Sequence, residues 1–129
     1  MSPLEQAPTQ VQRVRFEDAG ESTLCFLDFQ DLRTAHEALS AIADAREAIA
    51  QTPPFSLRVL TDVSGSHMSL PVIVAMQELA RANAPHVTKS AVVGLSLPHR
   101  VALRQIRRLT GRDIREFTSL DDALAYLAI

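Results

Sequence analysis

The sequence predicts one α/β domain built on a mostly parallel five-stranded sheet, with an antiparallel strand at its N-terminal edge. Two observations predict this fold. Segments with the alternation of strands take turns with segments of helical period along most of the chain, and a short turn joins the first two strand segments. Parallel neighbours need a crossover connection, which a helix supplies, whereas a tight turn joins antiparallel neighbours. The expected element order is therefore β-β-α-β-α-β-α-β-α.

Length and composition fit a single globular domain. The chain has 129 residues, of which 47% are hydrophobic and 22% charged, and a chain of this size can bury a core of its own. The formal net charge of -2 gives no overall attraction to nucleic acid or to an anionic membrane. Charged residues interrupt every apolar run, so we expect no membrane span and no integral membrane association.

The N-terminal residues predict a cytoplasmic protein with a short tail. Residues 1–9 contain Pro3 and Pro8 among polar neighbours without a period, a pattern typical of a mobile tail ahead of a domain over residues 10–129. The first residues have neither a basic patch nor an apolar run, so no signal peptide is expected. The single cysteine, Cys25, has no internal partner for a disulfide.

The first two strands are expected to form a hairpin. Val14 and Phe16 alternate with arginines in residues 11–16, as in a strand buried on one face. Residues 18–21, Asp-Ala-Gly-Glu, supply the turn. Residues 23–29 are apolar on both faces, which predicts a central strand.

A long amphipathic helix is expected over residues 31–51. Asp31 can cap it, and Pro53-Pro54 ends it. The side chains expected to face the core follow helical spacing. They are Leu32, Ala35, Leu39, Ile42, Arg46 and Ile49.

The middle of the chain predicts a strand, a loop and a second helix. Residues 57–63 have the composition of a buried strand, and the loop is Ser64 to Ser69. Pro71 stands in the first turn of the helix, which runs to about Asn83 before Ala84-Pro85 stops it. The expected apolar stripe consists of Val72, Ile73, Met76, Leu79 and Ala80.

The last third repeats this alternation. Residues 90–95 predict a fourth strand, and Pro98 opens a third helix, which Gly111 suits as a C-terminal cap. Residues 114–117 predict a short strand, and Ser119 with Asp122 resembles a capping pair for a last helix. The stripe expected to be buried in the third helix consists of Val101, Ala102, Ile106 and Leu109.

Several of these segments carry a resemblance to a known family. Residues 57–65, Leu-Arg-Val-Leu-Thr-Asp-Val-Ser-Gly, resemble the strand and following loop of the SpoIIAA-like, or STAS/Sec14-type, small bacterial domains. Residues 90–95, 109–114 and 117–127 are similar to the C-terminal half of uncharacterised members. The order and spacing of these motifs carry the resemblance.

The resemblance implies a domain that regulates by protein contact, or that binds a small or lipid-like ligand, rather than an enzyme. Fold alone establishes neither role. Anti-sigma-factor antagonists of the wider family have a phosphorylatable serine in an Asp-Ser-Ser-Gly type segment. The corresponding residues 69–72 read Ser-Leu-Pro-Val, so the chain departs from the family's phosphorylation pattern.

The loop after the third strand is the best candidate site. It follows the carboxyl end of a strand and precedes a helix, where α/β proteins bind ligands and where backbone N–H groups favour anions. A phosphate on Ser66 or Ser69 would be favoured by the helix dipole. A plainer interpretation is that Ser69 caps the helix and Gly65 forms the turn. The candidate binding residues are Asp62, Ser64, Gly65, Ser66, His67, Met68 and Ser69.

Neither a catalytic constellation nor a metal or cofactor site is expected. Asp62 could serve as a base, although an acid at a strand end more often bonds loop N–H groups. The four histidines lack the short spacings of a zinc site, and the glycines form neither a dinucleotide nor a P-loop motif. Cys25 stands in an apolar strand and is expected to be a small buried hydrophobe.

A basic surface is expected on the third helix. Its arginines could grip a phosphate, an acidic partner or a lipid headgroup. No aromatic residues lie between them for base stacking, so nucleic-acid binding is not expected. The candidate anion-binding residues are Arg100, Arg104, Arg107 and Arg108.

Three functional hypotheses follow. The leading one is a noncatalytic regulatory module that binds an unidentified protein partner through residues 64–69 and the start of the second helix. The alternative is a carrier of a small apolar or amphipathic ligand, held between the sheet and the helix of residues 31–51. The third is an enzyme acting through Asp62 and His67. A homodimer is also expected, since a small sheet leaves edge strands to cover.

Overall fold

The computed structural model describes residues 12–128 and has the predicted order of elements. The predicted tail of residues 1–9 lies outside the described residues. The elements are β1 (Val14–Ala19), β2 (Ser22–Asp28), α1 (Ala35–Ala50), β3 (Leu57–Asp62), α2 (Leu70–Asn83), β4 (Val87–Val93), α3 (Leu97–Thr110), β5 (Ile114–Phe117) and α4 (Leu120–Ala128), with a short 3₁₀ turn at Ala84–His86.

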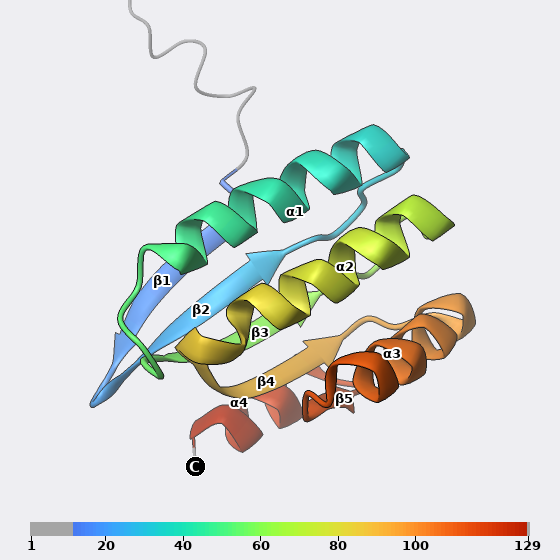
Figure 1. The fold of residues 1–129 in the computed structure, drawn as a ribbon. Helices are drawn as coiled ribbons and strands as arrows, with labels where there is room; N and C mark the ends of the chain where they lie inside the picture. Colours follow the sequence, from blue (N-terminus) through green and yellow to red (C-terminus); the bar gives the residue numbers. More distant parts are fainter. Residues whose placement is uncertain (1–11, 129) are drawn as a thin grey trace, which may run out of the picture.

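The sheet confirms the predicted α/β fold. Its strand order is β1-β2-β3-β4-β5, with β1 antiparallel to β2 and every other pair parallel. Helices α1, α2 and α3 lie side by side on one face, and α4 lies on the other (Figure 1). A buried cluster fills each side of the sheet. Because β2, β3 and β4 are parallel, the loops that follow them meet at one edge.

The first hairpin begins later than expected. The prediction placed the strand at residues 11–16, whereas β1 is Val14–Ala19 and turns through Gly20 at φ +80°. Phe16 is exposed, contrary to the prediction that both Val14 and Phe16 are buried. The reason is position: β1 is the edge of the sheet, and only its first residue packs against the core.

The start and the buried face of α1 correct two predictions. Thr34 caps the helix instead of Asp31: its side chain accepts from the Glu37 N–H, and Glu37 bonds back to the Thr34 N–H. Asp31 has a φ of 55°, outside a helix. Leu39 and Arg46 lie on the outer side, since small residues let α1 approach the sheet closely. The buried residues of α1 are Ala38, Ala41, Ile42, Ala45 and Ile49.

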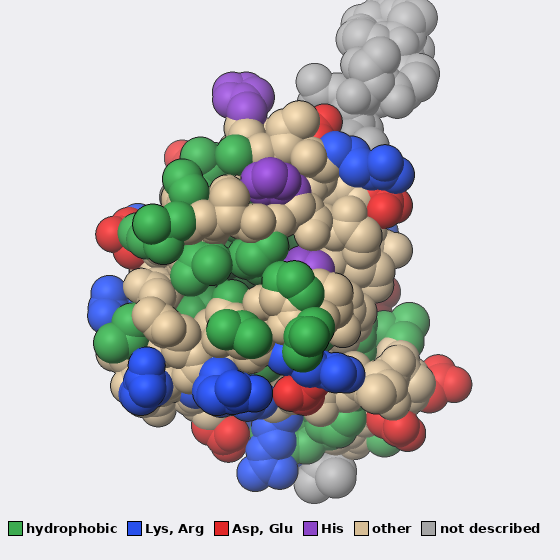
Figure 2. Space-filling view, turned by 90° about the vertical axis from the view of Figure 1, so that its right-hand side faces the viewer, with side chains coloured by type: hydrophobic (Ala, Val, Ile, Leu, Met, Phe, Trp, Pro, Cys, Tyr) green, Lys and Arg blue, Asp and Glu red, His purple; other side chains and the backbone are tan. Residues whose placement is uncertain are grey.

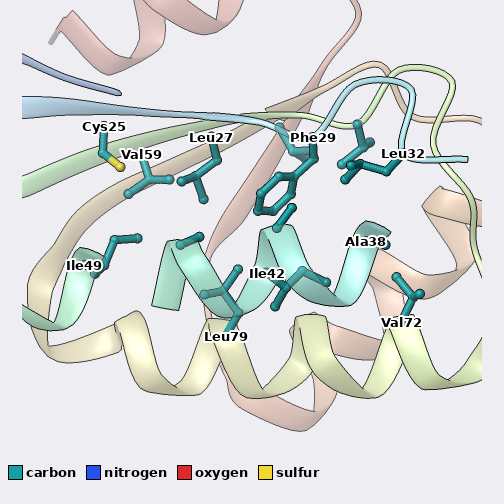
Figure 3. Close-up of a cluster of buried hydrophobic side chains, with 14 of the residues drawn as sticks. Cys25, Leu27, Phe29, Leu32, Ala38, Ile42, Ile49, Val59, Val72 and Leu79 are labelled. Carbon is teal, nitrogen blue, oxygen red and sulfur yellow. The ribbon is translucent and has the colours of Figure 1, made fainter. Parts of the chain in front are cut away.

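The layer between α1 and the sheet is densely filled. Phe29, Leu27 and Ile49 are among the largest fully buried side chains of the described residues. Figure 3 shows them interleaved with Val59 between the strands and the helix. Between the helices and the sheet, small hollows remain instead beneath α2 and α3.

Helix α3 also differs from its expected face. Ala102 and Ile106 are buried as predicted, but Val101 and Leu109 are exposed, and His99 and Leu103 take inward positions. The predicted ends are confirmed, because Gly111 adopts φ 70° at the C-terminal cap. Ser119 and Asp122 form the predicted pair at the start of α4: the Asp122 N–H donates to Ser119 Oγ at 3.1 Å.

Candidate functional site

The candidate loop lies between two other loops at the edge where the parallel strands end. It connects β3 to α2, and β3 lies between β2 and β4 in the sheet. Figure 2 shows the side of the molecule on which these strands end, with hydrophobic side chains gathered around a hollow. Hydrogen bonds join the candidate loop to both neighbours, and they determine what each predicted residue can do.

Asp62 fixes the beginning of the loop. Its Oδ1 accepts from the Ser64 N–H at 3.0 Å and from the Ser64 hydroxyl at 2.7 Å. Gly94, in the loop after β4, lies directly against this pair: a Cβ there would be 2.1 Å from Ser64 Oγ and 2.8 Å from Asp62 Oδ1. The carboxylate therefore holds a turn, which is the plainer of the two roles considered for Asp62.

Ser66 links the candidate loop to the loop after β2. Its hydroxyl donates to the Phe29 carbonyl and accepts from the Leu32 N–H at 3.0 Å. The Ser66 N–H donates to the Val63 carbonyl at 3.1 Å. A phosphate on Ser66 would break both hydroxyl bonds, so in this arrangement the side chain acts as a structural link.

The backbone reinforces this link. The His67 N–H donates to the Leu32 carbonyl at 2.7 Å, and the Asp31 N–H donates to the Ser64 carbonyl at 2.9 Å. Gly65 has a φ of +71°, and a Cβ there would lie 2.3 Å from Asp31 Oδ1. Gly65 thus forms the predicted turn, and the two loops make one rigid unit.

The end of the loop is apolar and leads into α2. Met68 packs against the core and lines a small hollow of about 50 Å³ with Ile73 and Ala102. Ser69 precedes α2 at the capping position, but its side chain makes no capping bond. Its Oγ is buried and has no hydrogen-bond partner among the described residues. Ser69 therefore occupies the N-cap position, but the prediction that its side chain caps the helix is wrong, since the hydroxyl turns inward.

His99 is the site residue that the sequence analysis missed. Its ring is 4% exposed. Nδ1 accepts from the Ser96 N–H at 3.0 Å and lies 2.8 Å from Ser96 Oγ, and Nε2 lies 3.1 Å from the Ser66 carbonyl. A backbone N–H can only donate, so Nδ1 is the acceptor and Nε2 carries the proton that it donates to Ser66. The sequence does hold one signal for this role: His99 stands three residues after Ser96, the position whose side chain reaches back to the N-cap residue in a capping box.

Burial keeps the imidazole neutral. Desolvation lowers the pKa of His99 below its ordinary value of 6.5, and the hydrogen bond to Ser66 opposes this in part. A second ring proton would point at the Ser96 N–H, which also donates. The neutral ring therefore ties the loop after β4 to the candidate loop.

The structure divides the four predicted anion-binding arginines. Arg100 pairs with Glu116 of β5 at 2.9 Å, and Arg107 Nε donates to the Ile114 carbonyl at 2.7 Å. Arg104 and Arg108 are exposed on the outer side of α3. One shared phosphate cradle is therefore not formed: two side chains attach α3 to β5, and two face outward.

A fifth arginine has a structural role. Arg112 donates to the Ala80 carbonyl and, at 2.8 Å, to Ser90 Oγ, so it joins the last turn of α2 to the middle of β4. Burial lowers its pKa from the ordinary value. With Leu103 and Ile114 it lines an apolar hollow of about 80 Å³ between α2 and α3.

Cys25 is the buried hydrophobe that the sequence predicted. It is fully buried in β2, and burial raises the pKa of its thiol to about 12. Residues 12–128 contain no group of three or more His, Cys, Asp or Glu side chains arranged for a metal ion. Within the same residues, no helix has the length and apolar character needed to cross a membrane.

Comparisons with solved structures agree with this architecture. An uncharacterized protein of the DUF3478 family with a SpoIIAA-like fold, from Shewanella loihica PV-4, is 16% identical, with a TM-score of 0.63 over 88% of this chain and 91% of that chain. An anti-sigma-factor antagonist (STAS) domain protein from Planctomyces limnophilus is 19% identical, with a TM-score of 0.58 over 90% and 98%. No protein-family model and no curated protein matches the sequence. The chain has the SpoIIAA-like fold.

Proposed function

We propose that this SpoIIAA-like domain is a noncatalytic regulatory module that binds a protein partner through residues 64–69 and the start of α2. The exposure of Leu70 carries the proposal: this first residue of α2 is 72% exposed, beside a loop in which Ser64 and Ser66 bond other groups of the chain. Leu97, the first residue of α3 at the same edge, is also 72% exposed. Neighbouring exposed apolar residues are typical of an interaction surface.

The hydrogen-bonded loops make this surface rigid. Ser66 bonds the loop before α1, and His99 bonds the carbonyl of Ser66 from α3. A surface already held in one conformation loses little entropy when a partner binds. The loops therefore favour recognition by a preformed surface over a loop that orders on binding.

The other two hypotheses have less support. Asp62 bonds Ser64, and the backbone of His67 bonds Leu32, so the observed contacts give these two residues separate structural roles. The space between the sheet and α1, where a carried ligand was expected, is filled by Phe29 and Ile49. The hollows of about 80 and 50 Å³ between α2 and α3 are small beside ligand pockets, which usually measure roughly 300 to 1,000 Å³. A wider hollow of about 420 Å³ lies on the surface between α1 and α2, but the charged Arg46, Glu47 and Glu78 line it, whereas ligand pockets are lined mostly by apolar side chains.

The regulatory role also agrees with the nature of one solved neighbour, an anti-sigma-factor antagonist (STAS) domain protein. That likeness extends to the fold, and the role comes to this chain as part of the proposal. The homodimer and the cytoplasmic location expected from the sequence stay predictions.

Affinity capture with matched leucine variants tests the proposal. Leu70→Asp places a charge on the surface, whereas Leu120→Asp changes the exposed first residue of α4 on the opposite face. We expect partners quantified by mass spectrometry to fall at least about tenfold with Leu70→Asp and to remain with Leu120→Asp. Specific partners that bind both variants as they bind the unchanged chain would refute the proposed surface.

A further inference from the structure

Helices α2 and α3 carry the same outward pattern. Each has 14 residues and begins with Leu-Pro. Leu70, Val74 and Arg81 of α2 occupy the same helical positions as Leu97, Val101 and Arg108 of α3. Between them stand Gln77 in α2 and Arg104 in α3.

These positions form one stripe on each helix. Their successive spacings of four, three and four residues place them along one side of a helix. The stripes face away from the core: Val74 is 45% exposed and Val101 54% exposed, and the leucines that precede them are more exposed still. Each stripe therefore has an apolar first half and a polar or basic second half. We name the two stripes together the α2–α3 surface: Leu70, Val74, Gln77, Arg81, Leu97, Val101, Arg104 and Arg108.

The two stripes lie together in space. Helices α2 and α3 pack against each other and follow parallel strands, so they point in the same direction (Figure 1). Both apolar halves therefore lie at the edge beside residues 64–69, and the arginines lie toward the other ends. Figure 2 shows hydrophobic side chains gathered on this edge, with Lys and Arg side chains along its border.

The charge on the α2–α3 surface determines what it can accept. It carries three arginines and no carboxylate. The nearby acids already have partners: Glu78 lies 3.7 Å from Arg46, and Glu116 lies 2.9 Å from Arg100. A second copy of the same surface would oppose arginines to arginines. The N-terminal residues of the chain itself are a poor occupant for this surface. Residues 1–11 contain one acidic residue, Glu5, to pair with three arginines, and two prolines, which disfavour a helix.

We propose that the α2–α3 surface docks an acidic amphipathic helix of the protein partner. The helix lies across the outer sides of α2 and α3, along the two stripes. Its apolar residues contact the leucines and valines, and its Asp or Glu side chains pair with Arg81, Arg104 and Arg108. The partner is thus recognised as an amphipathic helix, through its apolar face and its charges. The inference rests on the proposed function and names the chemistry of the partner.

The first test uses a synthetic probe and the full chain. The probe is a 21-residue helical peptide with leucines on one side of its first half and glutamates on the same side of its second half. The matched control replaces the glutamates by glutamines. We expect the glutamate peptide to bind at least about tenfold more tightly in fluorescence anisotropy and to shift the NMR signals of α2 and α3. Equal binding of the two peptides, no binding, or shifts confined to other elements would overturn the inference.

Charge reversal supplies the second test. The double variant Arg104→Glu, Arg108→Glu should bind the glutamate peptide at least about tenfold more weakly than the unchanged chain does. It should bind a peptide with lysines in place of the glutamates more tightly than it binds the glutamate peptide. Arg15→Glu with Arg115→Glu is the control, since both arginines lie on the face that carries α4, over Phe26 and Tyr126. Equal losses in the two double variants would overturn the inference.

Two further outcomes separate this inference from its alternatives. In affinity capture, a partner lost with Leu70→Asp but retained with Arg104→Glu and Arg108→Glu leaves the proposed function standing and overturns the acidic helix. Vesicles of phosphatidylcholine and phosphatidylserine test a lipid surface. We expect no cosedimentation of the chain, and cosedimentation that the same arginine variant abolishes would assign the surface to anionic lipid instead.

Discussion

The two sides of the helical layer meet the sheet differently. On the α1 side, alanines at the interface let the helix approach closely, and Phe29 and Ile49 fill the space. On the α2 and α3 side, hollows of about 80 and 50 Å³ remain, and Leu70 and Leu97 are exposed. The first side is built for stability. The second leaves apolar side chains exposed to solvent.

The largest expected effect lies on the filled side. Ile49→Ala removes a fully buried side chain and leaves a cavity in a layer that α1 closes, so we expect a loss of about 2–5 kcal/mol in the free energy of unfolding. Val101→Ala on the open side should change it by less than about 0.5 kcal/mol. Urea denaturation of both variants measures the difference, and equal losses would contradict the comparison.

A glycine pair tests the packing of the loops. Gly94→Ala adds a Cβ 2.1 Å from Ser64 Oγ at a φ of +82°, whereas Gly20→Ala meets nothing within 4 Å at a φ of +80°. The left-handed conformation costs about 1–2 kcal/mol in both variants, and the contact with Ser64 adds to it only at Gly94. We expect a larger drop in thermal stability for Gly94→Ala. Similar melting temperatures for the two variants would show that the candidate loop shifts to accommodate the added Cβ at little cost in stability.

The buried imidazole gives the open side a dependence on pH. The pKa of His99 is lower in the folded chain than its ordinary value of 6.5, so the unfolded chain binds the proton more readily. The stability supplied by the neutral ring is therefore complete above about pH 6.5 and declines as the pH falls from there toward the folded pKa. Urea titrations at several pH values should show a smaller decline in His99→Gln. An identical decline in that variant would show that other groups are responsible.

The smallest expected effect is on stability at the proposed surface itself. Leu70→Asp changes an exposed residue at the first position of α2, where an acid is favoured by the helix dipole. We expect the free energy of unfolding to change by less than about 0.5 kcal/mol. Calorimetry that shows a large loss would mean that Leu70 belongs to the core, and the contrast between the two sides would weaken.

Much of the fold was predictable because its signals are local. The alternation of strand and helix periods predicted every strand and α-helix, and Gly111 predicted the end of α3. The fourth strand was expected at residues 90–95, whereas β4 is Val87–Val93. The predictions of burial failed where the exposure of a side chain depends on the elements packed beside it. Phe16 has the alternation of a buried strand residue, yet β1 is an edge, and Leu39 has helical spacing, yet an alanine stripe faces the sheet.

The candidate site was less predictable than the fold. Its position after β3 followed from the order of elements, and the turn at Gly65 is confirmed. The inward hydroxyl of Ser69 and the ring of His99 could not be predicted, because their surroundings come from segments that are distant in the chain. His99 meets Ser66 across the sheet edge, and no spacing along the sequence encodes that contact.

By itself, the sequence determined the α/β class, the order of the elements and the burial of Cys25, since each depends on residues within a turn or a strand of one another. Only the tertiary structure decided that Ser66 and His99 join three loops into one unit, and that the stripes of α2 and α3 lie side by side on an open face. Those relations depend on the order and register of the strands, which bring distant segments together.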